Sequence, residues 1–121
     1  MARVLIVDDE KMICEEFRDI LQDEGHEVEM VLNGFDALHK VEESNFDIVF
    51  LDVLMPRMEG REVFEKMKKI RDIPIVIMSG YLPPNKEAEI LKMGALACLK
   101  KPLDLDQVKS LIESVKSSKS E

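Results

Sequence analysis

Residues 48–52 read IVFLD, a continuously apolar run that ends in an acid, and this stretch decides the fold. Two other runs have the same character, VLIV at residues 4–7 followed by Asp8, and IVIM at residues 75–78 followed by Ser79. Short apolar runs are typical of parallel strands that helices cover on both faces. The three runs therefore predict the central strands of a parallel sheet.

Two weaker strands are expected at the edges of this sheet. Residues 28–32 alternate, with Val28, Met30 and Leu32 on one side, which suits an edge strand. Residues 95–99 form a short fifth candidate, and this strand is also expected at an edge. The sheet would then have five strands.

Segments with a helical period of apolar residues separate the strands. Their apolar positions are Ile13, Phe17, Ile20 and Leu21; Ala37, Leu38 and Val41; Val63, Phe64 and Met67; Ile90, Leu91 and Met93; and Val108, Leu111, Ile112 and Val115. Gly25 and Gly94 stand where the first and fourth helices end, at positions that favour a positive φ. Asn33 is expected to cap the second helix, and Asp104 with Gln107 resembles a capping box before the fifth.

Strands and helices thus alternate along the whole chain. With right-handed crossovers, this predicts an α/β fold with a doubly wound, five-stranded parallel sheet of flavodoxin-like order 2-1-3-4-5 and helices on both faces. We expect one domain over residues 1–117 and a polar C-terminal tail over residues 118–121.

Composition narrows the range of functions. The net charge of −8 argues against direct DNA binding or binding to an anionic membrane surface as the main task. No apolar run approaches membrane-spanning length, and the two cysteines form no CxxC motif or Cys/His cluster. A cytoplasmic location without disulfides or a zinc site is expected.

Polar residues gather where the predicted strands end. Asp8 and Asp9 follow the first strand, Asp52 and Ser79 end the next two central strands, and Lys101 follows the fifth. The carboxyl ends of parallel strands share one edge, so three carboxylates would lie close together and repel by about 1–4 kcal/mol per pair at ~4 Å. Oxygen ligands alone suit a hard ion such as Mg²⁺. A carboxylate there can also attack phosphorus and form an aspartyl phosphate.

Four motifs carry a family resemblance. They are residues 8–10 (DDE), residues 52–60 (DVLMPRMEG), residues 78–81 (MSGY), and the stretch from residues 94–97 (GALA) to residues 101–102 (KP). In this order, and over nearly the whole chain, the set resembles the receiver domain of bacterial response regulators. The resemblance implies a Mg²⁺-dependent phosphoacceptor of two-component or phosphorelay signalling.

The resemblance also implies a role for each acid. Asp52 would be the phosphoacceptor. Asp8 and Asp9 would hold Mg²⁺, with Asp9 the more direct ligand, helped by Asp52 and by the backbone carbonyl of Leu54. Mn²⁺ would be an alternative ion.

Other positions would contact the phosphoryl group or transmit its arrival. Lys101 would pair with the phosphoryl group, and the Lys101–Pro102 peptide bond would be cis. Ser79 would move toward the phosphoryl group and carry the switch. Many receivers have Tyr or Phe where this chain has Cys98, so an aromatic readout is excluded there. Some stand-alone phosphorelay receivers share this departure.

The implied partners are proteins. A histidine kinase or histidine phosphotransfer protein would donate the phosphoryl group, and a downstream effector or a phosphorylation-dependent homodimer would read it. The chain would catalyse its own phosphorylation but act on no external substrate. Leu54 and Tyr81 stand at the two positions that set phosphate lifetime in the family, and neither is the amide or acid of fast-resetting receivers. Slow dephosphorylation is therefore expected.

Plainer interpretations exist for single residues. Asp8 or Asp9 could cap a helix, Ser79 could shape a turn, and Lys101 could be a solvated lysine; the surrounding set of motifs favours a site. Cys14 and Cys98 are interpreted as packing residues. His26 and His39 lie away from the acids and receive no role.

Three other functions compete with the receiver interpretation. An aspartyl-phosphate phosphatase commonly has a second Asp two residues after its nucleophile, where this chain has Leu54. Flavodoxin-like FMN binding needs a phosphate-binding first loop, and the acids at residues 8–10 would repel the phosphate. A degenerate scaffold would not need the complete set of acids, Ser79 and Lys101.

Overall fold

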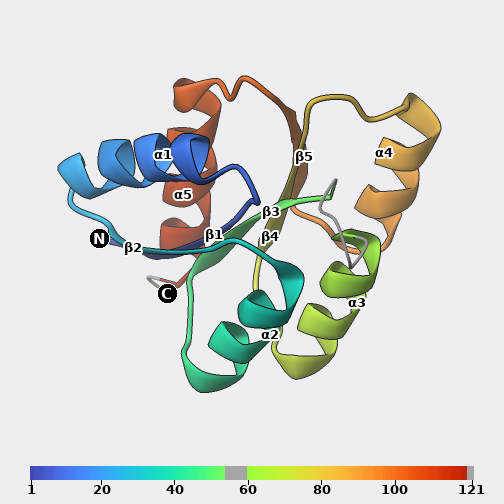
Figure 1. Ribbon diagram of the computed structural model, residues 1–121, viewed down its shortest axis with the longest axis horizontal. Helices are drawn as coiled ribbons and strands as arrows, with labels where there is room; N and C mark the ends of the chain where they lie inside the picture. Colours follow the sequence, from blue (N-terminus) through green and yellow to red (C-terminus); the bar gives the residue numbers. More distant parts are fainter. Residues whose placement is uncertain (54–59, 120–121) are drawn as a thin grey trace.

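Five strands and five helices alternate along the chain in the computed structural model, which describes residues 1–53 and 60–119 (Figure 1). The strands are β1 (Arg3–Val7), β2 (Glu27–Val31), β3 (Ile48–Asp52), β4 (Ile75–Ser79) and β5 (Ala97–Lys100). The helices are α1 (Lys11–Asp23), α2 (Gly34–Glu43), α3 (Gly60–Ile70), α4 (Pro84–Lys92) and α5 (Leu105–Lys119). The sheet is parallel throughout, with the order β2-β1-β3-β4-β5, which confirms the predicted fold.

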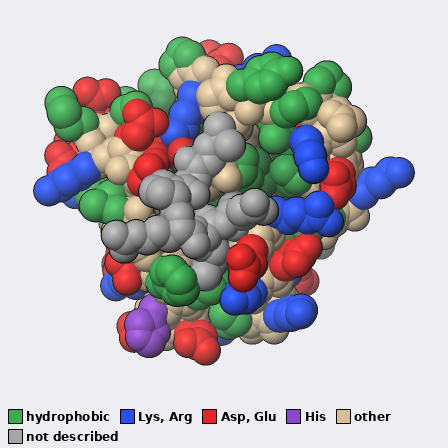
Figure 2. Space-filling view, turned by 45° about the vertical axis from the view of Figure 1, so that its right-hand side comes forward, with side chains coloured by type: hydrophobic (Ala, Val, Ile, Leu, Met, Phe, Trp, Pro, Cys, Tyr) green, Lys and Arg blue, Asp and Glu red, His purple; other side chains and the backbone are tan. Residues whose placement is uncertain are grey.

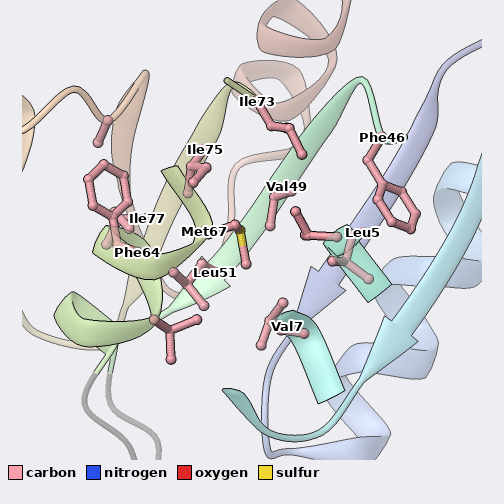
Figure 3. Close-up of a cluster of buried hydrophobic side chains, with 14 of the residues drawn as sticks. Leu5, Val7, Phe46, Val49, Leu51, Phe64, Met67, Ile73, Ile75 and Ile77 are labelled. Atoms are coloured by element: carbon pink, nitrogen blue, oxygen red, sulfur yellow. The ribbon is translucent and has the colours of Figure 1, made fainter. Parts of the chain in front are cut away.

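Helices cover both faces of the sheet. Figure 1 shows α1 and α5 on one face and α2, α3 and α4 on the other. Successive strand residues point to opposite faces, so Leu5, Leu51 and Ile77 pack in the cluster that contains side chains of α2 and α3 (Figure 3). Ile6 and Phe50 pack in the cluster with α1 and α5. Two buried faces explain why the central strands are apolar without alternation.

The expected helix ends are present. Gly25 has φ 91° and Gly94 has φ 112°, a backbone conformation that glycine adopts most easily. The Asn33 side chain accepts a hydrogen bond of 2.8 Å from the N–H of Asp36. The Asp104 carboxylate accepts one of 2.9 Å from a backbone N–H two residues later. These local signals confirm the start and stop positions that the sequence indicated, although Asp104 bonds the N–H of Asp106, and its pairing with Gln107 in a capping box stays a prediction.

The predicted apolar stripe of α1 was partly wrong. The helix buries Cys14, Phe17 and Leu21, whereas Ile13 is 44% exposed and Ile20 is 36% exposed. At about 100° per residue, Ile13 and Ile20 lie on the flank of the buried stripe. They line a hollow of about 280 Å³ between α1 and the segment that follows β5.

The edge strand β2 also differs from its predicted pattern. The strand ends at Val31, and Leu32 beyond it is 38% exposed. Val28 is buried in the α1 and α5 cluster, and Val31 is buried in the cluster on the opposite face. The strand lies at the edge of the sheet as expected, but helices cover both of its faces, so simple alternation was the wrong pattern.

Arg71 links α3 to the end of α2. Its Nε donates a hydrogen bond of 2.8 Å to the carbonyl of Val41, and a second guanidinium nitrogen donates one of 3.1 Å to the Asn45 side chain. The last carbonyls of a helix have no partner within the helix. Arg71 therefore supplies donors that the end of α2 needs.

Charged side chains alternate on the face shown in Figure 2. Exposed ion pairs on α3 and α4 join Arg61 to Glu65 and Glu89, and Lys66 to Glu62. Such pairs contribute about 1 kcal/mol or less each.

Within residues 1–53 and 60–119, no helix is long and apolar enough to cross a membrane. Helix α5 continues through Lys119, into the segment expected to be a tail.

Candidate phosphoryl-transfer site

The sheet register aligns the polar residues that end the strands. Val7 of β1 pairs with Leu51 of β3. The residues that follow them, Asp8 and Asp52, therefore stand at the same level of the sheet. Asp52 in turn pairs with Met78, immediately before Ser79. Because the strands are parallel and paired in this register, these ends lie at the same side of the sheet. The fold therefore brings together acids that are distant in the sequence.

Lys101 lies between the buried acids. Its Nζ is 2.6 Å from Oδ2 of Asp8 and 2.8 Å from Oδ2 of Asp52. The Asp8 side chain is 2% exposed, the Asp52 side chain is 5% exposed, and the Lys101 side chain is 15% exposed. One ammonium thus bridges two carboxylates that have little contact with water.

The ammonium is strongly stabilised by these neighbours. Burial alone would lower the pKa of Lys101, but the hydrogen bonds that its ammonium donates to Asp52 and Asp8, together with their negative charges, outweigh burial and raise the pKa above the usual 10.5. Lys101 therefore carries a full positive charge at neutral pH.

Asp8 is held through both of its oxygens. Oδ2 receives the Lys101 ammonium, and Oδ1 accepts a hydrogen bond of 3.0 Å from the backbone N–H of Glu10. The turn after β1 therefore fixes the orientation of this carboxylate.

Glu10 is the site residue that the sequence reasoning missed. Its Oε1 lies 3.5 Å from Nζ of Lys101. Carboxylate oxygens of Asp8, Glu10 and Asp52 all lie within 4.8 Å of one another. The signal was present in the DDE motif at residues 8–10, but no role was assigned to its third acid.

Asp9 is placed differently from its neighbours. Its side chain is exposed to solvent, whereas Asp8 is 1% exposed as a whole residue. The acid cluster of the described residues consists of Asp8, Glu10 and Asp52. The metal-binding role expected for Asp9 stays a prediction, and the expected ligand carbonyl of Leu54 lies outside the described residues.

Ser79 is buried and bonded to its own loop. Its Oγ donates a hydrogen bond of 2.7 Å to the carbonyl of Tyr81 and accepts one of 3.2 Å from the N–H of Tyr81. The backbone carbonyl of Ser79 accepts a hydrogen bond from the N–H of Lys101. The serine hydroxyl therefore shapes a turn in this structure. Tyr81, two residues further along the chain, is exposed.

The remaining predicted positions lie on β5 and its end. The Lys101–Pro102 peptide bond is cis. Cys98 is partly buried against the α2 and α3 cluster, and burial raises the pKa of its thiol to about 11. His26 has a structural contact, because its Nδ1 accepts a hydrogen bond from the N–H of Ala2.

The donor set fits a hard divalent cation. Every ligand atom that Asp8, Glu10 and Asp52 offer is a carboxylate oxygen, the type that Mg²⁺ prefers. Three carboxylates against one ammonium leave an excess of two negative charges, which a divalent cation would neutralise. The residues of the site therefore suit Mg²⁺.

Comparison with known proteins gives one family. The family model described as the response regulator receiver domain matches residues 4–113. The chain is 39% identical over 106 residues to the transcriptional regulatory protein ZraR of Klebsiella oxytoca, covering 87% of this chain and 24% of that protein. It is 32% identical over 112 residues to sporulation initiation phosphotransferase F of Bacillus subtilis, covering 92% and 90%. The chain thus spans about a quarter of the length of ZraR.

A solved structure agrees with this match. The response regulator TrrA of Thermotoga maritima, in complex with Mg²⁺–BeF, superposes with a TM-score of 0.84 at 32% identity, covering 95% of this chain and 99% of that one. Receiver domains are phosphoacceptors of two-component systems that bind Mg²⁺ through acidic residues and interact with kinases or phosphotransfer proteins. The family match, the relatives and the fold agree, and the chain belongs to the response regulator receiver domain family.

Proposed function

We propose that Asp52 is the phosphoacceptor of this receiver domain and that a phosphohistidine on a kinase or phosphotransfer protein is the donor. A carboxylate oxygen of Asp52 attacks phosphorus, the new P–O bond forms, and the P–N bond to the donor imidazole breaks. The imidazole nitrogen leaves with the bonding pair and takes a proton, so that an acyl phosphate and a neutral histidine result.

The contacts of the two buried aspartates support this choice of acceptor. Asp8 has one oxygen on Lys101 and the other on the N–H of Glu10, so it is oriented as a supporting group. Asp52 ends the central strand β3 and shares the same ammonium. The single observation that carries the proposal is this Lys101 bridge between two buried carboxylates.

Lys101 would stay beside the transferred group. Its ammonium already lies 2.8 Å from Asp52, and its raised pKa keeps it charged. Phosphoryl transfer depends mainly on positioning and on the neutralisation of oxygen charge. We assign Lys101 to bind a phosphoryl oxygen once Asp52 is modified.

Asp8, Asp9 and Asp52, with the carbonyl of Leu54, are proposed to hold Mg²⁺, for which Mn²⁺ can substitute. When bound, the ion supplies charge neutralisation for the phosphoryl oxygens. A rotation of the exposed Asp9 side chain would be required for this role. TrrA, crystallised with Mg²⁺–BeF, supports the assignment by similarity.

Ser79 is proposed to carry the switch. Its hydroxyl would leave the two hydrogen bonds to Tyr81 and bind the phosphoryl group. Phosphorylation can favour the new arrangement only by the difference in stabilisation between the two states. The Tyr81 loop and the neighbouring α4 and β5 would then present a changed surface to a downstream protein or to a second phosphorylated copy.

The reaction is proposed as a slow switch without turnover on an external substrate. Tyr81 and Leu54 offer no amide or acid to orient an attacking water, so the acyl phosphate should persist. A half-life of seconds in the absence of a phosphatase would contradict this part. The cytoplasmic location expected from the sequence also stays a prediction.

The test is intact mass after incubation with acetyl phosphate. We expect one phosphoryl adduct on the wild type with Mg²⁺, none with EDTA, and none on Asp52→Asn. Asp72→Asn, which removes an exposed acid from the segment after α3, serves as a matched control and should be modified normally. An adduct on Asp52→Asn equal to that of the wild type would disprove the proposed acceptor.

A further inference from the structure

Glu10 occupies the N-cap position of α1 without capping the helix. Among the described residues, its carboxylate accepts no capping hydrogen bond. Glutamate is not among the favoured N-cap residues, and Lys11, the first residue of the helix, places a positive charge where the helix dipole disfavours it. The helix dipole favours a negative charge at this end of α1, but no capping hydrogen bond fixes the direction of the Glu10 side chain.

The side chain is directed at Lys101 instead. Glu10 Oε1 lies 3.5 Å from Lys101 Nζ, which already contacts Asp8 and Asp52. The Glu10 side chain is 56% exposed, in contrast to 2% for Asp8 and 5% for Asp52. Glu10 thus approaches the ammonium from the solvent side of the cluster.

A cation and Lys101 compete for the same two carboxylates. A divalent cation that binds Asp8 and Asp52 must displace part of their contact with the Lys101 ammonium. The cation would then repel the displaced ammonium. Glu10 offers a third carboxylate within reach of Lys101. The release of Lys101 is therefore less costly than in a site with two acids.

We propose that Glu10 is a positioning residue that raises the affinity of the centre for a divalent cation by holding Lys101 while the cation takes Asp8 and Asp52. The inference rests on the proposed function and extends it to a residue outside the expected ligand set. Its negative charge has a second, opposite effect, because it repels an anionic phosphoryl donor. Glu10 would therefore raise the affinity for the cation and lower the rate of phosphorylation.

The two effects give changes of opposite sign in Glu10→Gln. Loss of one negative charge beside the cation site, screened by salt, corresponds to about 3- to 10-fold weaker Mg²⁺ binding. At saturating Mg²⁺, phosphorylation by acetyl phosphate should be faster than in the wild type, because one negative charge fewer repels the anionic donor. Distortion of the site would lower both quantities, so the combination distinguishes a charge effect from damage.

The experiment measures Mg²⁺ affinity by isothermal titration calorimetry, and separately the phosphorylation rate at saturating Mg²⁺. Glu10→Asp keeps the charge and should remain within about twofold of the wild type. Glu43→Gln is the matched control, because it removes an exposed acid at the end of α2, the end that leads into β3 and lies opposite the site.

Two results would overturn the inference. One is Mg²⁺ affinity of Glu10→Gln equal to that of Glu43→Gln; the other is a variant that is slower even at saturating Mg²⁺. Both presuppose a wild type that binds Mg²⁺ and is phosphorylated. A wild type that does neither would refute the proposed function as well, so the two failures are distinguishable.

Discussion

Replacement of Lys101 by methionine tests how far the site depends on one ammonium. Methionine keeps an apolar stem of similar length, so the change removes mainly the charge. Asp8 and Asp52 would then remain buried without the Lys101 ammonium, which now lies 2.6 Å and 2.8 Å from their oxygens. The variant should be less stable when no divalent cation is present.

The expected size follows from the contacts. Each lost hydrogen bond between charged groups is worth about 1.5–3 kcal/mol. Carboxylate oxygens of the cluster lie within 4.8 Å of one another. At that separation two charges repel by about 1–3 kcal/mol for effective dielectric constants between ~80 and ~20. Because these contributions overlap, we expect a total loss of about 3–5 kcal/mol in the free energy of unfolding, the range found for broken buried ion pairs.

Urea unfolding followed by far-ultraviolet circular dichroism measures this loss, since the chain has no Trp. In EDTA, Lys101→Met should lose about 3–5 kcal/mol, and Mg²⁺ should restore a large part of it. Lys100→Met, the same change at an exposed neighbouring position, should lose less than about 1 kcal/mol. If Lys101→Met lost no more unfolding free energy in EDTA than Lys100→Met, the ammonium would not stabilise the buried carboxylates.

Three further predictions concern pH, the end of α2 and the thiols. Because the folded pKa of Lys101 is raised, its stabilising contribution is full below about pH 10.5 and is lost as pH rises through the folded pKa, so the wild-type urea midpoint should fall more steeply above pH 10.5 than that of Lys101→Met. Arg71→Met removes donors to the Val41 carbonyl and its neighbours and should cost about 1–2 kcal/mol in urea unfolding; no measurable loss would contradict the capping role. Burial raises the pKa of Cys14 and Cys98 to about 11, so at pH 8 iodoacetamide should modify the native protein at least about 10-fold more slowly than the unfolded protein, and equal rates would contradict it.

The sequence predicted the sheet because burial on two faces leaves a distinctive pattern. Residues 4–7, 48–51 and 75–78 are apolar without interruption, and each proved to be a central strand. Glycines with positive φ and an Asn33 cap marked the helix ends for local reasons. Such signals depend on a few neighbouring residues, so they can be read without tertiary structure.

Other features depended on packing between distant elements. Ile13 and Ile20 are as apolar as the buried residues of α1, and only the position of the segment after β5 decides that they line a hollow. Glu10 looked like part of an acidic motif until the fold placed Lys101 beside it. The sequence allowed a turn at Ser79. The hydrogen bonds between Ser79 and Tyr81 depend on the geometry of the loop, which the sequence does not give.

The most direct test of the central claim locates the modified residue. Borohydride reduces an acyl phosphate to the alcohol, so a phosphorylated aspartate becomes homoserine and can be found by peptide mass mapping. After incubation with Mg²⁺ and acetyl phosphate, we expect homoserine at Asp52 and none at Asp8 or Asp9. Homoserine at Asp8 or Asp9, or its absence from all three positions in a protein that carries a phosphoryl adduct, would contradict the account.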